Sequence, residues 1–145
     1  MNKKNNTIWS TRFKNQLSSF FQDIGSSLDV DKRLYAEDIF ASIIHVQMLS
    51  KQRIITKRQS KKIIIGLKKI KNEIDKNKFK FNKKYEDIHL NIEKRLFEII
   101  GENAGYLHIA RSRNDQVITD FKLWIKKASN EIIKNLNVLI KSFLK

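Results

Sequence analysis

Seven side chains that can form hydrogen bonds are concentrated between residues 108 and 116, directly before a strongly apolar helical pattern. They are His108, Arg111, Ser112, Arg113, Asn114, Asp115 and Gln116. The start of a helix offers free backbone amides and a positive dipole end, which together attract anions. Arg113 adds a planar fork suited to a carboxylate or phosphate, and Asn114 offers a donor and an acceptor. The local pattern fits an anion site and an ordinary cap by Ser112 or Asn114 equally well.

A second candidate is the stretch "YEDIHLNIE", residues 85–93. Glu86 and Asp87 lie at the start of a predicted helix, and His89 precedes Glu93 by one turn on the same face. A carboxylate partner would orient His89, whose side chain titrates near neutral pH. The stretch by itself favours the simpler interpretation, a capped helix with His89 and Glu93 paired on its surface.

Metal and cofactor sites find no support in the sequence. The absence of Cys excludes disulfides and thiolate ligands. His45, His89 and His108 share no spacing typical of a zinc site. We find no glycine loop for phosphate and no readable nucleophile–base pair, so we expect no metal and no cofactor.

Length and composition indicate one helical domain, or one domain and part of another. Of the 145 residues, 41% are hydrophobic, four are Gly and none is Pro, so little interrupts helices. No apolar run approaches 18 residues, so we expect no membrane span. The first residues lack the apolar core of a secretory signal, and we expect a cytoplasmic location.

The charge is strongly positive, with 30 basic and 15 acidic residues and a net charge of +15. Such a balance can indicate a nucleic-acid partner. However, the Lys residues are spread over every predicted helix and the aromatic residues fall at apolar-face spacing. A basic patch, not net charge, makes a phosphate-binding surface. We therefore expect no nucleic-acid partner and keep a nucleic-acid-binding helical protein as the weakest alternative.

Apolar spacing predicts three helices before the polar stretch at residues 108–116. The first begins with Asp29 or Asp31 as its cap and ends near Arg53, and Thr56 caps the second. The third follows a basic connector, ends near Gly101 and leaves Gly105 in a loop. The apolar residues that define these helices are Ile39, Ile43, Val46 and Leu49, then Ile63, Leu67, Ile70 and Ile74, then Ile88, Ile92, Leu96 and Ile99.

A fourth apolar pattern continues from Val117 to Phe143, which corresponds to a helix roughly 40 Å long. Its length and broad apolar face are typical of a bundle helix that needs neighbours. We therefore predict an all-α fold, with an N-terminal helical domain over residues 1–110. Residues 111–145 would form the start of a central helical bundle.

Several stretches, in this order, carry a family resemblance. They are "W..RF" at residues 9–13, the stretch from Ser27 to Leu49, "GL..I..EI" at 66–74, "EDIH..IE..L" at 86–96 and "GYLHIARSRNDQVITDFKLW" at 105–124. Together they resemble the N-terminal part of the argininosuccinate lyase family, in the fumarase/aspartase superfamily. The chain departs from the family at Ser10 and Thr11, where two glycines are usual, and at Ile109, where Thr is usual.

The resemblance implies the last step of arginine biosynthesis, the cleavage of argininosuccinate to arginine and fumarate. A proton leaves the succinyl carbon and the guanidinium is then expelled. The intermediate carbanion is delocalised into a carboxylate, which requires directed donors. By resemblance, Ser27, Arg113 and Asn114 contact the substrate, and His89 with Asp87 supports the geometry and the proton balance. "RSRNDQ" then looks like a carboxylate-binding helix start.

The resemblance also implies a homotetramer whose active sites combine several subunits. The family's general acid/base His and its mobile Ser loop correspond to segments that these 145 residues do not contain. We therefore assign no catalytic residue here and expect no fumarate release from this chain alone. A non-catalytic remnant, or a structural helical subunit of the same family, is the main alternative.

Overall fold

The computed structural model describes residues 24–144, so the motif at Trp9, Arg12 and Phe13 and the departures at Ser10 and Thr11 lie outside the described part. Its elements are α2 (Leu28–Asp31), η1 (Lys32–Leu34), α3 (Tyr35–Lys51), α4 (Lys57–Asp75), α5 (Ile88–Ile100), η2 (Gly101–His108) and α6 (Arg113–Phe143), where η marks a 3-10 helix. Residues 24–144 contain no strand, which confirms the all-α prediction.

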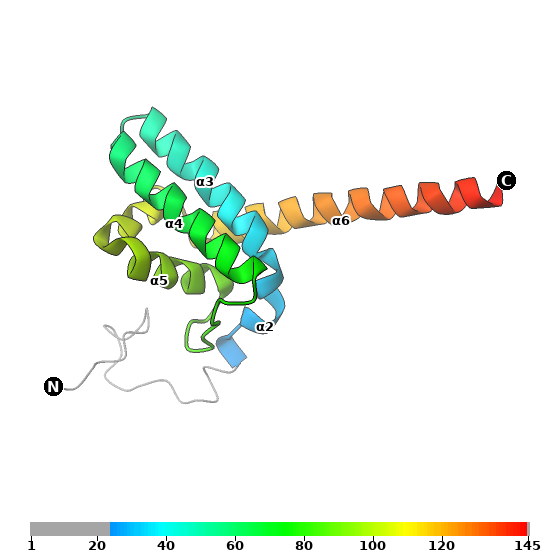
Figure 1. Cartoon of the computed structure of the whole chain (residues 1–145), viewed down its shortest axis with the longest axis horizontal. Helices are drawn as coiled ribbons and strands as arrows, with labels where there is room; N and C mark the ends of the chain where they lie inside the picture. Colours follow the sequence, from blue (N-terminus) through cyan, green and yellow to red (C-terminus); the bar gives the residue numbers. More distant parts are fainter. Residues whose placement is uncertain (1–23, 145) are drawn as a thin grey trace.

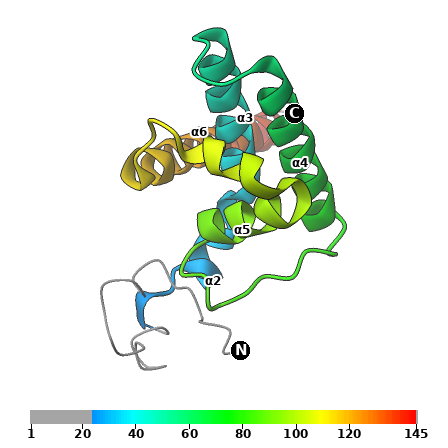
Figure 2. The same cartoon turned by 90° about the vertical axis from the view of Figure 1, so that its left-hand side faces the viewer.

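Helices α3 and α4 lie side by side, and α5 packs against them (Figures 1 and 2). The apolar residues that the sequence pattern assigned to one face of each helix meet in a single core. Its fully buried members are Leu28 of α2, Ile39, Val46 and Leu49 of α3, Ile63, Leu67 and Ile70 of α4, Ile88, Ile92 and Leu96 of α5, and Leu107 of η2. The predicted apolar faces of the three helices are therefore confirmed.

The predicted first helix is wrong in its continuity and in its cap. The segment is divided into α2, η1 and α3, and Ser27 is the residue before α2. Asp29 and Asp31 lie inside the first turn instead. The Asp31 carboxylate accepts a hydrogen bond of 3.2 Å from the Ile88 amide, so it satisfies the start of α5 rather than that of its own helix.

Two other helix boundaries agree with the sequence. Thr56 caps α4, and its hydroxyl and the Gln59 side chain satisfy each other's backbone amides in a capping box. Gly101 follows α5 with φ of 65°, a conformation that favours glycine. Gly105 was expected in a loop, but it lies within η2 because the chain continues as a 3-10 helix up to His108.

Helix α6 contains 31 residues and is about 45 Å long. Its first turns pack against α3, whereas its second half extends away from the other helices (Figure 1). Every residue from 129 to 144 is exposed, including Ile132, Leu136, Leu139 and Phe143. The predicted long helix with a broad, unpartnered apolar face is confirmed, while the domain boundary at residues 110 and 111 stays a prediction.

None of the helices within residues 24–144 combines the length and the apolar character needed to cross a membrane.

Candidate functional site

The polar stretch before α6 does form a helix start. Ser112 is the N-cap, and its hydroxyl accepts a hydrogen bond of 3.2 Å from the Asn114 amide. The side chains of Asn114 and Asp115 are exposed in the first turn. The cap and the anion site that the sequence left open are compatible, because Ser112 satisfies one amide and the Asn114 side chain stays accessible.

Arg113, the predicted carboxylate-binding residue, is 26% exposed and already surrounded by partners. Its Nη1 donates a hydrogen bond of 2.7 Å to Gln116 Oε1. Its Nη2 lies 3.0 Å from Glu93 Oε1, and its Nε lies 3.7 Å from Asp87 Oδ2. Only the contact with Gln116 is a hydrogen bond, while Glu93 and Asp87 lie near as opposite charges, so a ligand carboxylate would share Arg113 with them.

Ser27 lies against the start of α5, although the two are far apart in the sequence. The Ser27 amide donates a hydrogen bond of 2.8 Å to the Glu86 carbonyl oxygen, and its hydroxyl contacts the Asp31 carboxylate at 2.5 Å. Asp87 caps α5 by accepting a hydrogen bond of 2.6 Å from the Leu90 amide. Because Asp87 also faces Arg113, the start of α5 connects the Ser27 segment to the start of α6.

His89 is not part of a surface pair with Glu93, as the simpler interpretation of the sequence had it. Its side chain is 1% exposed, and its Nδ1 lies 3.2 Å from Asp38 Oδ1 and 3.5 Å from Asp120 Oδ2. Glu93 instead contacts Arg113 and lies 3.6 Å from His108 Nδ1. The prediction fails because the packing of α3 and α6 over this face of α5 buries a residue that a single-helix pattern places outside.

The ionisation of the buried cluster Asp38–His89–Asp120 follows from burial and mutual contact. Burial alone would raise the pKa of Asp38, but contacts from His89 and Gln116 bring it below its ordinary value. Burial opposes a charge on His89, yet the Asp38 carboxylate raises the His89 pKa overall. Burial and the negative charge of Asp38 raise the pKa of Asp120 to about 8. Burial and the neighbouring Asp38 charge therefore favour the protonated form of Asp120, while the Asp38 carboxylate favours the charged form of His89.

Arg111 borders this cluster from the segment before α6. Its Nη1 donates a hydrogen bond of 3.1 Å to Ser42 Oγ, and burial lowers its pKa. Its Nε and Nη2 are buried without a hydrogen-bond partner, as are both carboxyl oxygens of Asp120. Buried donors and acceptors that lack a protein partner are commonly bridged by water inside the protein.

The cluster could in principle hold a cation, because Asp38, His89 and Asp120 each offer one ligand atom within 4.8 Å of the others. The positive guanidinium of Arg111 acts on Asp38 and Asp120 as well, which opposes cation binding there. The absence of a metal from this protein stays a prediction.

Sequence reasoning missed Asp38, Gln116 and Asp120 as members of one cluster. A signal was present, since Asp38 shares its helix face with Ser42 and Val46 on an otherwise apolar stripe. A polar residue on the buried face of a helix requires a partner from elsewhere in the fold. The pattern could identify that need but not the partners.

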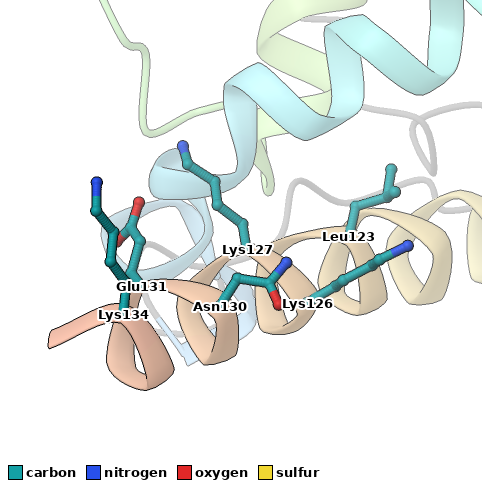
Figure 3. A pocket seen from close by; sticks show the side chains of 6 residues that line it. All are labelled: Leu123, Lys126, Lys127, Asn130, Glu131 and Lys134. Carbon is teal, nitrogen blue, oxygen red and sulfur yellow. The ribbon is translucent and has the colours of Figure 1, made fainter. Parts of the chain in front are cut away.

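An open hollow runs along the middle of α6 (Figure 3), lined by Leu123, Lys126, Lys127, Asn130, Glu131 and Lys134. Lys127 Nζ lies 3.9 Å from Glu37 Oε1 of α3. None of the predicted site residues lines this hollow, so it does not belong to the candidate site.

Many known proteins are similar to this chain, and three of the most similar bear the name argininosuccinate lyase. The protein of Pelagibacter ubique is 61% identical over 144 residues, which are 99% of this chain and 31% of that protein. Those of Campylobacter jejuni and Bartonella bacilliformis are 50% and 44% identical over 97% and 98% of this chain. The aligned region covers 31% and 30% of these two proteins. The chain thus spans about a third of the length of these relatives.

These relatives confirm the resemblance to argininosuccinate lyases that the sequence motifs indicated. A family model described as "Lyase" matches residues 11–145, which is nearly the whole sequence. The match includes all the described helices, the start of α6 and the buried cluster beneath it. The chain belongs to this lyase family.

Proposed function

We propose that this chain contributes part of the active site of an argininosuccinate lyase, which cleaves argininosuccinate to arginine and fumarate. The observation that carries the proposal is the 61% identity, over 99% of the chain, with a relative of that name. The geometry at the start of α6 supports it, because an exposed Asn114 and a partly exposed Arg113 stand where free helix amides attract anions.

The chemistry assigns distinct tasks to these groups. Loss of a proton from the succinyl carbon places negative charge on a neighbouring carboxylate, and fixed donors stabilise that charge as it develops. Arg113, Asn114 and Ser27 would bind the substrate. Asp87 and His89 support the site from behind, since Asp87 caps α5 and His89 lies within the buried cluster. No catalytic acid or base is assigned to this chain.

The unpartnered face of α6 supports the proposed homotetramer. Seven large apolar side chains in its second half are each at least 51% exposed, namely Ile132, Ile133, Leu136, Val138, Leu139, Ile140 and Phe143. Apolar faces of this extent on one helix are typical of helix–helix interfaces. The cytoplasmic location and the absence of a nucleic-acid partner stay predictions from the sequence.

The experiment follows fumarate release from argininosuccinate by the full-length protein that contains this sequence. Asn114→Ala and Arg113→Ala should each raise KM several-fold or more, because each removes a directed donor to a carboxylate. Asn130→Ala, at an exposed position further along α6, serves as the matched control and should leave the kinetics unchanged. Unchanged kinetics in both site variants would remove the start of α6 from the active site.

The structural-subunit alternative predicts an assembled protein that releases no fumarate. The nucleic-acid alternative predicts affinity for DNA or RNA that falls steeply as salt rises, with a slope set by the number of phosphates contacted. Measuring fumarate release and nucleic-acid binding on one preparation separates the three functions.

A further inference from the structure

Gln116 connects the start of α6 to the buried cluster through both ends of its side-chain amide. Its Oε1 accepts the hydrogen bond of 2.7 Å from Arg113 Nη1, and its Nε2 donates one to Asp38 Oδ1. The same Asp38 oxygen lies 3.2 Å from His89 Nδ1. A continuous series of contacts therefore runs from Arg113, through Gln116 and Asp38, to His89 on α5.

The two ends of this amide cannot be exchanged. The guanidinium of Arg113 can only donate, and the ionised Asp38 carboxylate can only accept. Turning the amide over would place NH2 against the guanidinium and C=O against the carboxylate, and both contacts would become repulsive. Gln116 is 2% exposed, so water cannot easily replace a lost partner. The side chain is therefore held from both sides.

We propose that Gln116, anchored by Asp38, is a positioning residue that holds the Arg113 guanidinium in the direction from which it meets an anionic substrate. The inference rests on the proposed function, because it takes Arg113 as a substrate contact. Gln116 acts through Arg113 and need not touch the substrate itself. Its anchor is firm, since Asp38 is 1% exposed and also contacts His89 and Ser42.

The need for such an anchor follows from the other partners of Arg113. Asp87, the N-cap of α5, and Glu93, in its second turn, attract the guanidinium toward that helix. Gln116 is the group on α6 that holds it by a hydrogen bond. Loss of that hydrogen bond leaves the carboxylates of α5 to decide the orientation, and fewer N–H bonds then face a ligand.

The test follows the side-chain NMR signals of Arg113 and His89 in the isotope-labelled 145-residue chain, and it measures fumarate binding by titration of the full-length protein that contains this sequence. Gln116→Met keeps the size of the side chain and removes both hydrogen bonds. We expect both signals to shift and the dissociation constant for fumarate to rise several-fold. Gln47→Met, the same change at an exposed position of α3, should leave both NMR signals and the dissociation constant at wild-type values. Wild-type Arg113 signals and affinity in Gln116→Met would overturn the proposal.

Gln116→Glu tests the contact with Arg113 and the contact with Asp38 separately. It can also be used if Gln116→Met does not fold. The signals are followed as pH rises, because the introduced carboxyl group accepts from Arg113 in either form but loses its donor to Asp38 only once it ionises. The Arg113 signal should then stay close to wild type while the His89 signal moves, and a His89 signal that does not move contradicts the anchor at Asp38. If the wild-type full-length protein binds no fumarate, the proposed substrate contact fails, whereas the Arg113 signal separately decides whether Gln116 holds the guanidinium in place.

Discussion

Arg113 Nη2 lies 3.0 Å from Glu93 Oε1, so the guanidinium at the start of α6 is paired with a carboxylate of α5. This pairing connects the start of α6 to the second turn of α5. In the proposed site, a substrate carboxylate would compete with Glu93 for the same donor. We therefore expect Glu93 to lower the affinity of the site for anions, in addition to pairing α5 with α6.

Replacing Glu93 by Gln should strengthen anion binding and weaken the fold. The variant removes a negative charge beside Arg113, and the partly exposed pair is worth about 1 kcal/mol or less. The dissociation constant for fumarate, measured by calorimetry, should fall by a few-fold. Glu98→Gln is the matched control, because Glu98 pairs with Arg95 on the same helix. Equal affinities in both variants would show that Glu93 does not compete with the ligand.

Asp120 should make stability depend on pH. Its pKa of about 8 exceeds the ordinary value of 3.8, so the folded chain keeps a proton that the unfolded chain releases. This contribution to stability is fully present below about pH 4 and is lost as pH rises through about 8. Asp120→Asn imitates the protonated carboxyl and should therefore be more stable than wild type above about pH 8.

The free energy of unfolding in urea, measured from about pH 4 to above about pH 8, shows the effect of Asp120→Asn. The difference between the variant and the wild type should grow with pH, by at most about 1.4 kcal/mol per unit. For Asp115→Asn, at an exposed position of the same helix, the free energy of unfolding should vary with pH as it does for the wild type. A parallel curve for Asp120→Asn as well would mean that Asp120 is ionised in the folded chain.

Gly66 should resist substitution, although alanine favours helices. A Cβ at position 66 of α4 would lie 2.5 Å from Leu96 Cδ1 and 3.3 Å from Ile100 Cγ2 of α5. Leu96 is fully buried, so its displacement should cost about 1 to 3 kcal/mol in Gly66→Ala, more than the gain in helix propensity. Thermal unfolding measures the loss. Gly105→Ala, with no atom within 4 Å of the added Cβ, should be neutral or stabilising.

The exposed face of α6 should drive association. Leu136→Lys places a charge in the middle of this face and should shift the chain to a smaller species in light scattering. Asn135→Lys adds the same charge at the neighbouring exposed position and keeps the apolar side chains. An unchanged molar mass in Leu136→Lys would contradict an interface at this face.

The helices could be predicted from the sequence because their signals are local. Ile63, Leu67 and Ile70 recur at helical spacing, and the Thr56 cap and its partner Gln59 are three residues apart. Such patterns depend on neighbours within one helix, which the sequence displays directly. For the same reason, Arg113 and Asn114 could be assigned to a helix start.

The buried cluster could not be predicted in this way, because its contacts connect distant parts of the chain. Gln116 and Asp38 are 78 positions apart, and no spacing rule relates them. His89 was expected on a surface because polar residues usually are exposed. The residues of α3 and α6 that cover it have no signature in the sequence around position 89.

The hydrogen bond from the Ile88 amide to Asp31 spans 57 positions and has a consequence for the order of events during synthesis. The ribosome completes the segment around Asp31 well before Ile88 exists, so the partner of that carboxylate is missing while α3 and α4 emerge. Contacts between distant positions form late because the intervening chain must first lose its freedom. The segment of α2 should therefore dock only after α5 has been made. Its protection from proteolysis should appear later than that of α3 and α4.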